Sequence, residues 1–105
     1  MENNAKVVII GGGVVGCSIL YHLSKFGLKD CVLLERNELT SGSSWHAAGN
    51  VHVISSDPNI SRMMAYTIGL YKEIEKESGH SVGFKPSGGF YLASNEVWAE
   101  YLKRE

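Results

Sequence analysis

Three glycines near the start of the chain have the spacing of a phosphate-binding turn. Gly11, Gly13 and Gly16 lie between a β-branched run and a helical pattern, in the order Gly-x-Gly-x-x-Gly. In such a turn the first glycine permits a tight bend, the second lets the backbone approach a pyrophosphate, and the third lets helix and strand pack closely. The start of the helix adds free N–H groups and a positive dipole end, which favour phosphate. The pattern predicts a dinucleotide site.

An acidic residue occupies the second position that such a site requires. Glu35 ends the next apolar run, 19 residues after Gly16, where a carboxylate can accept hydrogen bonds from the ribose hydroxyls of an adenosine. An acid at this point argues against a 2′-phosphate on the ligand. The neighbouring basic residue Arg36 could instead favour a 2′-phosphate, and its other interpretation is a solvated charge.

A segment rich in serine and glycine follows at 40–49. Its hydroxyls and its short helical start offer additional donors to a pyrophosphate or a flavin, which an ordinary NAD domain does not need directly after its second strand. The segment therefore favours FAD over NAD. Elsewhere the spacing supports no Ser/His/Asp set, paired carboxylates or metal-ligand cluster, so we assign no catalytic residue and no metal site within the chain.

The elements that must hold these residues form a βαβ unit of the α/β class. Residues 6–10 are a lysine followed by four β-branched residues. Residues 15–26 carry apolar positions at helical spacing up to Gly27, and residues 31–34 form a second apolar run. Uninterrupted runs of this kind are typical of parallel strands that are buried on both faces. We therefore expect a Rossmann-like arrangement with the glycines between the first strand and the helix.

The second half of the chain predicts helices and two short strands. Asp57 suits a helix N-cap with Pro58 at the first helical position, and the helical pattern ends near Gly79. Strands are expected near 82–85 and 89–93, and a last helix follows them.

The sheet that these elements predict is incomplete. Two parallel strands do not make a stable doubly wound sheet, and the last helical pattern is still running at Glu105. We interpret residues 1–105 as the N-terminal part of an FAD-binding domain, with strands of a substrate domain beginning near 82–94 and the remainder of the enzyme outside this chain.

Composition narrows the possible partners. The 105 residues are 44% hydrophobic and 20% charged, with a formal net charge of −1, which excludes a disordered or collagen-like chain and gives no support to a nucleic-acid partner. No apolar stretch approaches the ~20 residues of a membrane span. Cys17 and Cys31 form no CxxC pair and suit small reduced core residues. We expect an aqueous, reducing compartment: the cytoplasm, or the mitochondrial matrix in a eukaryote.

The motifs together resemble a known family. They are VIIGGGVVG at 8–16, LLER at 33–36, LTSGSSWHAAG at 39–49, ESG at 77–79 and SGGFYLASN at 87–95. With these motifs the chain is similar to the N-terminus of dimethylglycine and sarcosine dehydrogenases, FAD-dependent amine oxidoreductases of the D-amino-acid-oxidase-like superfamily. The resemblance covers essentially the whole chain. It implies a fold of the glutathione-reductase type, of which this chain would hold the first βαβ unit.

The resemblance also implies roles for individual residues. In the family, the histidine of the Trp-His-Ala-Ala-Gly motif is bonded covalently to the 8α-methyl group of FAD, and His46 is the matching position. A neutral imidazole nitrogen is a suitable nucleophile for that methyl group; from the residues alone, His46 could equally be hydrogen-bonded at a short helix start. The adenine-side contacts would be Gly11, Gly13, Val14, Val15, Gly16, Glu35 and Arg36. The residues around the pyrophosphate and isoalloxazine would be Gly42, Ser43, Ser44, Ala47 and Gly49.

The reaction implied by the resemblance is oxidation of an N-methylated glycine, either sarcosine or dimethylglycine. A hydride would pass from the N-methyl carbon to flavin N5, leaving an iminium that yields formaldehyde or is captured by tetrahydrofolate bound elsewhere in the protein. An electron acceptor would then reoxidise the flavin. Two alternatives stay open: a glycine or D-amino-acid oxidase with dissociable FAD, and a catalytically silent regulatory homologue that keeps the fold.

Overall fold

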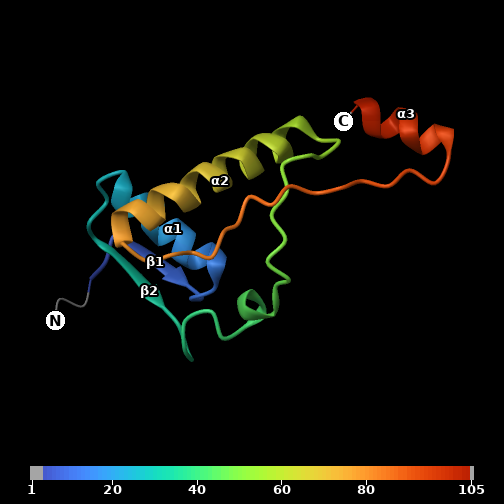
Figure 1. Cartoon of the computed structure of the whole chain (residues 1–105). Helices are drawn as coiled ribbons and strands as arrows, with labels where there is room; N and C mark the ends of the chain where they lie inside the picture. The colour runs from blue at the N-terminus through green and yellow to red at the C-terminus, as the bar shows by residue number, and fades with distance from the viewer. Residues whose placement is uncertain (1–3, 105) are drawn as a thin grey trace. The chain divides into compact units, whose positions relative to one another are not determined.

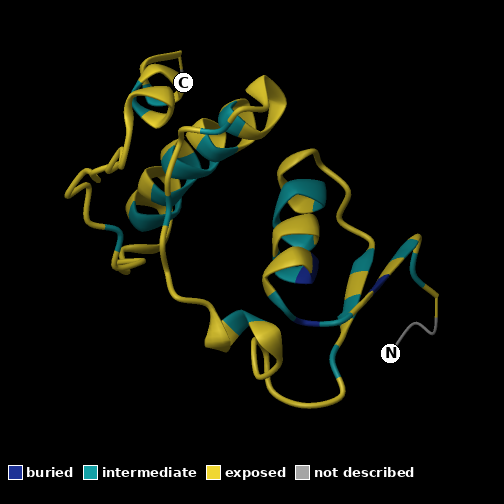
Figure 2. Cartoon of the chain, turned by 90° about the vertical axis from the view of Figure 1, so that its right-hand side faces the viewer, coloured by how far each residue is buried: buried dark blue, intermediate teal, exposed yellow. Residues whose placement is uncertain are grey.

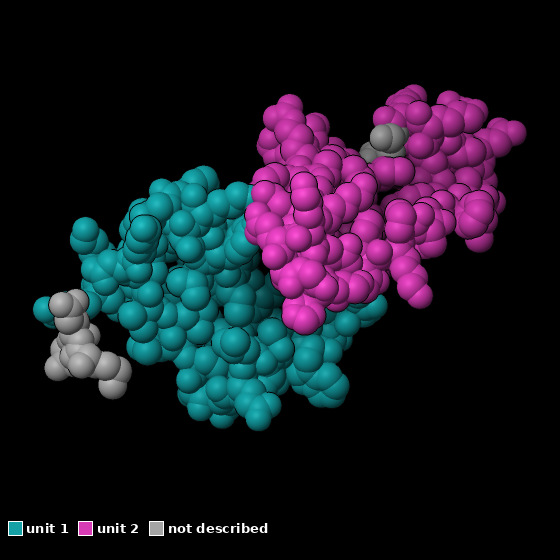
Figure 3. Space-filling view, turned by 60° about the vertical axis from the view of Figure 1, so that its left-hand side comes forward, with its two compact units in different colours: residues 1–49 teal, residues 50–105 magenta. Residues whose placement is uncertain are grey.

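The computed structural model describes residues 4–104. Their division into two compact units falls between residues 49 and 50 (Figure 3). In chain order the elements are β1 (Val7–Ile10), α1 (Val14–Lys25), β2 (Cys31–Leu34), the 3₁₀ helix η1 (Ser43–His46), α2 (Pro58–Ser78) and α3 (Glu96–Arg104) (Figure 1). The first four elements belong to the first unit, which holds every predicted cofactor-binding residue.

The first unit is a parallel βαβ motif, as the sequence predicted. β1 and β2 pair in parallel, with Val7 opposite Cys31 and Ile10 opposite Leu34. The Gly11 N–H extends the pairing by donating to the Leu34 carbonyl at 2.8 Å. α1 connects the strands and packs against both of them. The glycine turn therefore lies at the carboxyl end of β1, beside the carboxyl end of β2.

The sheet is buried on one face only (Figure 2). Ile9 is 7% exposed, whereas Val8, Ile10, Val32 and Leu34 are 52%, 86%, 43% and 53% exposed. The prediction that both strands are buried on both faces is therefore wrong for this chain. Side chains alternate between the faces of a strand, and α1 contacts the sheet from one side. Burying each of these four exposed side chains completely would stabilise the protein by about 1.5–3 kcal/mol. The second face of the sheet is therefore a strongly apolar surface.

The ends of α2 follow the sequence signals. The Asp57 carboxylate accepts hydrogen bonds from the N–H groups of Asn59 at 2.7 Å and Ile60 at 3.4 Å, and Pro58 occupies the first turn. At the other end Gly79 adopts φ 70°, and its N–H donates to the Glu75 carbonyl at 3.0 Å. Glycine adopts this left-handed conformation without steric cost, which is why the helix stops there.

Two predicted strands are not formed. Within residues 4–104 the only strands are β1 and β2, and residues 81–93 adopt no regular structure. Strand structure depends on hydrogen bonds to a neighbouring strand, and Phe90 and Leu92 in this segment are 97% and 94% exposed. The strands expected near 82–85 and 89–93 are therefore absent here, and the assignment of 82–94 to a substrate domain stays a prediction.

Across residues 4–104, no helix combines the length and the apolar character that crossing a bilayer requires.

Candidate cofactor-binding site

An open hollow of about 410 Å³ lies at the turn between β1 and α1. It brings the glycine turn together with two serines from a segment some thirty residues later in the chain. Its lining residues are Ile9, Ile10, Gly11, Gly13, Val14, Val15, Gly16, Ile19, Ser43 and Ser44. The sequence-predicted residues of the glycine motif and the two predicted serines therefore share one surface.

The close approach of helix and strand depends on Gly16. A Cβ atom added at Gly16 would lie far inside contact distance of the Gly11 carbonyl oxygen, and 3.4 Å from Ile9 Cγ2. Gly11 itself adopts φ 105°, a conformation that side chains disfavour. The tight bend and the close helix–strand packing expected of the first and third glycines are both present. As a result, the first turn of α1 opens directly onto the hollow.

The N-terminus of α1 is capped by a residue far away in the sequence. The N-cap residue Gly13 has no side chain, and the Ser44 hydroxyl accepts a hydrogen bond from the Val14 N–H at 2.8 Å. A Cβ at Gly13 would lie 3.1 Å from Ser44 Oγ, so the absence of a side chain at Gly13 leaves room for this contact. Ser44 thereby joins the segment 40–49 to the glycine turn.

Glu35 holds the glycine turn from the end of β2. Its Oε2 accepts from the Gly12 N–H at 2.6 Å and its Oε1 accepts from the Asn37 N–H at 2.9 Å. The Gly12 N–H, followed by the Asn37 N–H, holds the pKa of the Glu35 carboxyl below its ordinary value. Each carboxylate oxygen has a further lone pair, so the carboxylate can still accept from ribose hydroxyls while it holds the turn.

Gly12 is a site residue that sequence reasoning missed. It is buried, its N–H donates to Glu35, and its carbonyl accepts from the Thr40 N–H at 2.8 Å. A Cβ at this position would lie 2.5 Å from Leu39 Cδ2 and 3.0 Å from Glu35 Cβ. The sequence did contain a signal for Gly12. Three glycines stand in a row at 11–13, although the motif requires only Gly11 and Gly13.

Thr40 was also missed, and it marks the turn into the serine segment. It is the only non-glycine residue with a positive φ (64°) in the described part of the chain. This conformation costs an ordinary residue about 1–2 kcal/mol, and the hydrogen bond from the Thr40 N–H to the Gly12 carbonyl helps to hold it. The strained residue directs the chain from β2 towards η1.

The other predicted residues lie outside the hollow. His46 is exposed at the end of η1; its Nδ1 lies 3.1 Å from the Gly42 carbonyl oxygen and its ring centroid 4.4 Å from that of Trp45. The remaining predicted residues that do not line the hollow are Glu35, Arg36, Gly42, Ala47 and Gly49. Glu35 still reaches the turn through Gly12, and the backbone and charge of Arg36 act on the Glu35 carboxylate.

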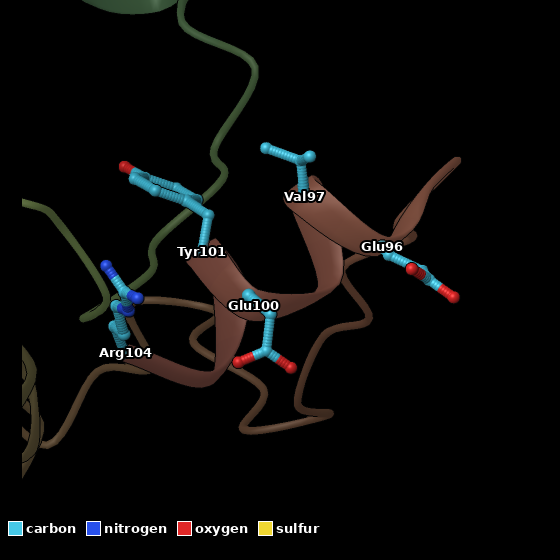
Figure 4. A pocket seen from close by; sticks show the side chains of 5 residues that line it. All are labelled: Glu96, Val97, Glu100, Tyr101 and Arg104. Atoms are coloured by element: carbon cyan, nitrogen blue, oxygen red, sulfur yellow. The ribbon is translucent and has the colours of Figure 1, made fainter.

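A second hollow of about 440 Å³ lies beside α3 (Figure 4). Its lining residues are Glu96, Val97, Glu100, Tyr101 and Arg104, all from that helix. Because a single helix supplies every lining residue, this is a helix surface without opposing walls. Within residues 4–104, no group of three or more His, Cys, Asp or Glu side chains is placed to hold a metal ion.

Comparison with known proteins assigns the family. A model of the family described as FAD dependent oxidoreductase matches residues 6–105. The chain belongs to this family. It is 45% identical over 102 residues to the mitochondrial dimethylglycine dehydrogenase of Homo sapiens and 40% identical over 105 residues to the mitochondrial sarcosine dehydrogenase of Homo sapiens. These alignments cover 97% and 99% of this chain but only 12% and 11% of the relatives.

A solved structure supports the fold. The glycine oxidase from Bacillus cereus ATCC 14579 matches with a TM-score of 0.70 and 27% identity, over 96% of this chain and 29% of that chain. The predicted fold class, an incomplete FAD-binding βαβ unit of the D-amino-acid-oxidase type, is therefore confirmed.

The residues present fit the FAD that the family name implies. The glycine turn leaves the first turn of α1 facing a hollow, at a point where a Cβ on Gly16 would collide with the backbone. N–H groups at a helix start and a carboxylate at the end of the second strand are the donor and acceptor types that an adenine dinucleotide needs.

The first prediction concerns Gly16→Ala in the intact protein. Alanine gains about 0.5–1 kcal/mol over glycine within a helix, but the new methyl group must displace the Gly11 carbonyl, and ordinary overpacking already costs about 1–3 kcal/mol. We therefore expect a lower thermal midpoint and a lower flavin content. Gly69→Ala is the control, because Gly69 lies within α2 with nothing within 4 Å of the added Cβ. A Gly16→Ala protein as stable as the control would contradict the close packing.

The second prediction concerns the pH dependence of the Glu35 contact. The pKa of Glu35 is lower in the folded protein than in the unfolded chain, where it is about 4.5. The contribution of Glu35 to the free energy of unfolding is therefore complete above pH ~4.5 and is lost as the pH falls through the pKa of the folded protein. Glu35→Gln should therefore lower the thermal midpoint most near pH ~7, and the difference should shrink below pH ~4.5. Glu38→Gln, at an exposed glutamate, is the control. A difference that stays constant down to acid pH would rule out the charged contact.

Proposed function

We propose that this chain forms the N-terminal, FAD-binding part of an oxidoreductase that oxidises an N-methylated glycine, either sarcosine or dimethylglycine. The observation that carries the proposal is the likeness to dimethylglycine and sarcosine dehydrogenases along nearly the whole chain, the glycine turn and the serine segment included. Because the chain spans a small share of those relatives, the residues that contact the amine are assigned to other parts of the protein. These two relatives are named as mitochondrial proteins, and this protein would work in the mitochondrial matrix if it comes from a eukaryote.

The chain's own residues would hold the cofactor. The Gly13, Val15 and Gly16 N–H groups would bind the pyrophosphate, because the Gly11, Gly12 and Val14 N–H groups already donate to other residues. Glu35 would accept from the ribose hydroxyls. When bound, FAD would supply the acceptor for a hydride from the N-methyl carbon of the substrate. The partners proposed with this function are the methylated amine, an electron acceptor and, in another part of the protein, tetrahydrofolate.

The geometry of His46 supports a role as the covalent attachment site for the flavin. Its Nδ1 lies 3.1 Å from the Gly42 carbonyl oxygen, and a carbonyl oxygen only accepts, so in the neutral ring the proton belongs on Nδ1. Nε2 then keeps its lone pair, and the side chain is exposed. A neutral imidazole with a free lone pair is a competent nucleophile.

The attachment would need no metal, and dioxygen in solution would be the oxidant. His46 Nε2 would bond to the 8α-carbon in place of one C–H bond of that methyl group, and the two electrons of the C–H bond would pass to the flavin ring. The methyl proton and the Nδ1 proton would leave, and dioxygen would take up the two electrons with two protons as hydrogen peroxide. The histidine itself would be neither oxidised nor reduced.

The third prediction tests the activity. The intact protein should carry flavin, and anaerobic addition of sarcosine or dimethylglycine should bleach its visible absorption, because the two electrons of the substrate reduce the ring. Glycine and a D-amino acid serve as comparison substrates. Reduction by glycine or the D-amino acid alone would favour an oxidase of the related class, and flavin that no amine reduces would favour a silent regulatory homologue.

The fourth prediction tests the attachment site. After acid precipitation, the wild-type pellet should stay yellow, and the tryptic peptide that contains His46 should carry the mass of FAD. His46→Ala should still bind FAD through the glycine turn but release it into acid. His52→Ala is the matched control, since this exposed histidine lies six residues further along the chain. An unmodified His46 peptide from active, yellow enzyme would favour dissociable FAD.

A further inference from the structure

The segment that carries His46 is tied to the glycine turn at two points. The Thr40 N–H donates to the Gly12 carbonyl at 2.8 Å, and the Val14 N–H donates to the Ser44 hydroxyl at 2.8 Å. The first tie uses only the backbone, whereas the second depends on one side chain. Ser44 is half-buried in this contact.

Ser44 and His46 belong to the same short turn of helix. η1 spans only Ser43–His46, and the hydrogen bond at its C-terminal cap, from the Ala47 N–H to the Ser44 carbonyl, is long, at 3.4 Å. So short a 3₁₀ helix has little stability of its own. Its position therefore depends on what its side chains contact, and the contact that links it to α1 is the one made by Ser44.

We infer that Ser44 is a positioning residue for the attachment of the flavin at His46, an inference that rests on the proposed function. Its hydroxyl fixes η1 against the first turn of α1, so the imidazole is held at a set place relative to the glycine turn that binds the dinucleotide. A reacting group that is held in place attacks faster than one that must find its position in each encounter. The hydroxyl accepts from Val14 and keeps its own proton to donate, so a bound phosphate need not displace it.

A purely structural role for Ser44 makes a different prediction. If the hydroxyl only capped α1, its loss would lower the stability of the protein but would leave the rate of attachment at saturating FAD unchanged, provided that the protein stays folded. If it positions η1, its loss slows attachment even where the protein is fully folded. The rate at saturating FAD therefore separates the two roles.

The experiment compares Ser44→Ala, Ser44→Thr and Ser41→Ala with wild type in the intact protein, prepared with little flavin and incubated in aerated buffer with excess FAD. Acid precipitation at intervals gives the covalently bound fraction, and mass spectrometry locates it. Ser44→Ala should attach FAD about ten- to a hundredfold more slowly. Ser44→Thr should restore the rate because it keeps the hydroxyl. Ser41→Ala, at an exposed serine of the same segment, should match wild type.

Amide hydrogen exchange of the flavin-free proteins provides a second readout that does not depend on attachment. Peptides covering Val14 and 42–47 should exchange faster in Ser44→Ala than in wild type or Ser41→Ala, because the tie to α1 is lost. Unchanged exchange, or a wild-type rate of attachment in Ser44→Ala, would overturn the inference. A rate that falls equally in Ser44→Thr would also overturn it. If wild type never binds flavin covalently, the attachment proposed at His46 is wrong, whatever the variants do. The positioning role of Ser44 would then be wrong as well.

Discussion

The site depends on the confinement of one backbone unit, that of Gly12. Its N–H is held by the Glu35 carboxylate and its carbonyl by the Thr40 N–H, and the space beside its Cα is filled by Leu39. A buried polar group that lacks a partner is costly, so both hydrogen bonds matter to the turn. These two hydrogen bonds join the loop after β1 to the segment that follows β2. The other contacts of the site are built around this junction.

A charged acceptor is well suited to this junction. Glu35 stays ionised because backbone N–H groups point at it, and hydrogen bonds to an ionised acceptor are stronger than those between neutral groups. The same carboxylate lies where the ribose of a dinucleotide is expected. Glu35 thus contributes to the shape of the turn before any ligand arrives and remains available to the ligand afterwards.

The sequence predicted those features that depend on local signals. We could predict the order of strand, glycines, helix, strand and Glu35 from the sequence. We could also predict the helix cap at Asp57 and the helix end at Gly79, because each of these features depends on residues within a few positions of one another. The hydrogen bond between Val14 and Ser44 could not be predicted, because these residues are 30 positions apart. The contacts that hold Gly12 could not be predicted either, because they come from residues 23–28 positions further along the chain. The expected strands at 82–85 and 89–93 failed for a related reason, since pattern alone does not supply a partner strand.

The packing at Gly12 also bears on how this protein can be recombined with its relatives. Leu39 lies against the position where a Gly12 side chain would begin, and Ser44 against that of Gly13, so these two stretches of chain are complementary in shape. In a chimera whose crossover lies between α1 and β2, the glycine turn would come from one parent, and the stretch with Leu39 and Ser44 that packs against it would come from the other. A crossover after residue 49, where the first compact unit ends, would inherit both from the same parent. The sequence from β1 to residue 49 is thus a module that can be exchanged without separating surfaces that fit each other.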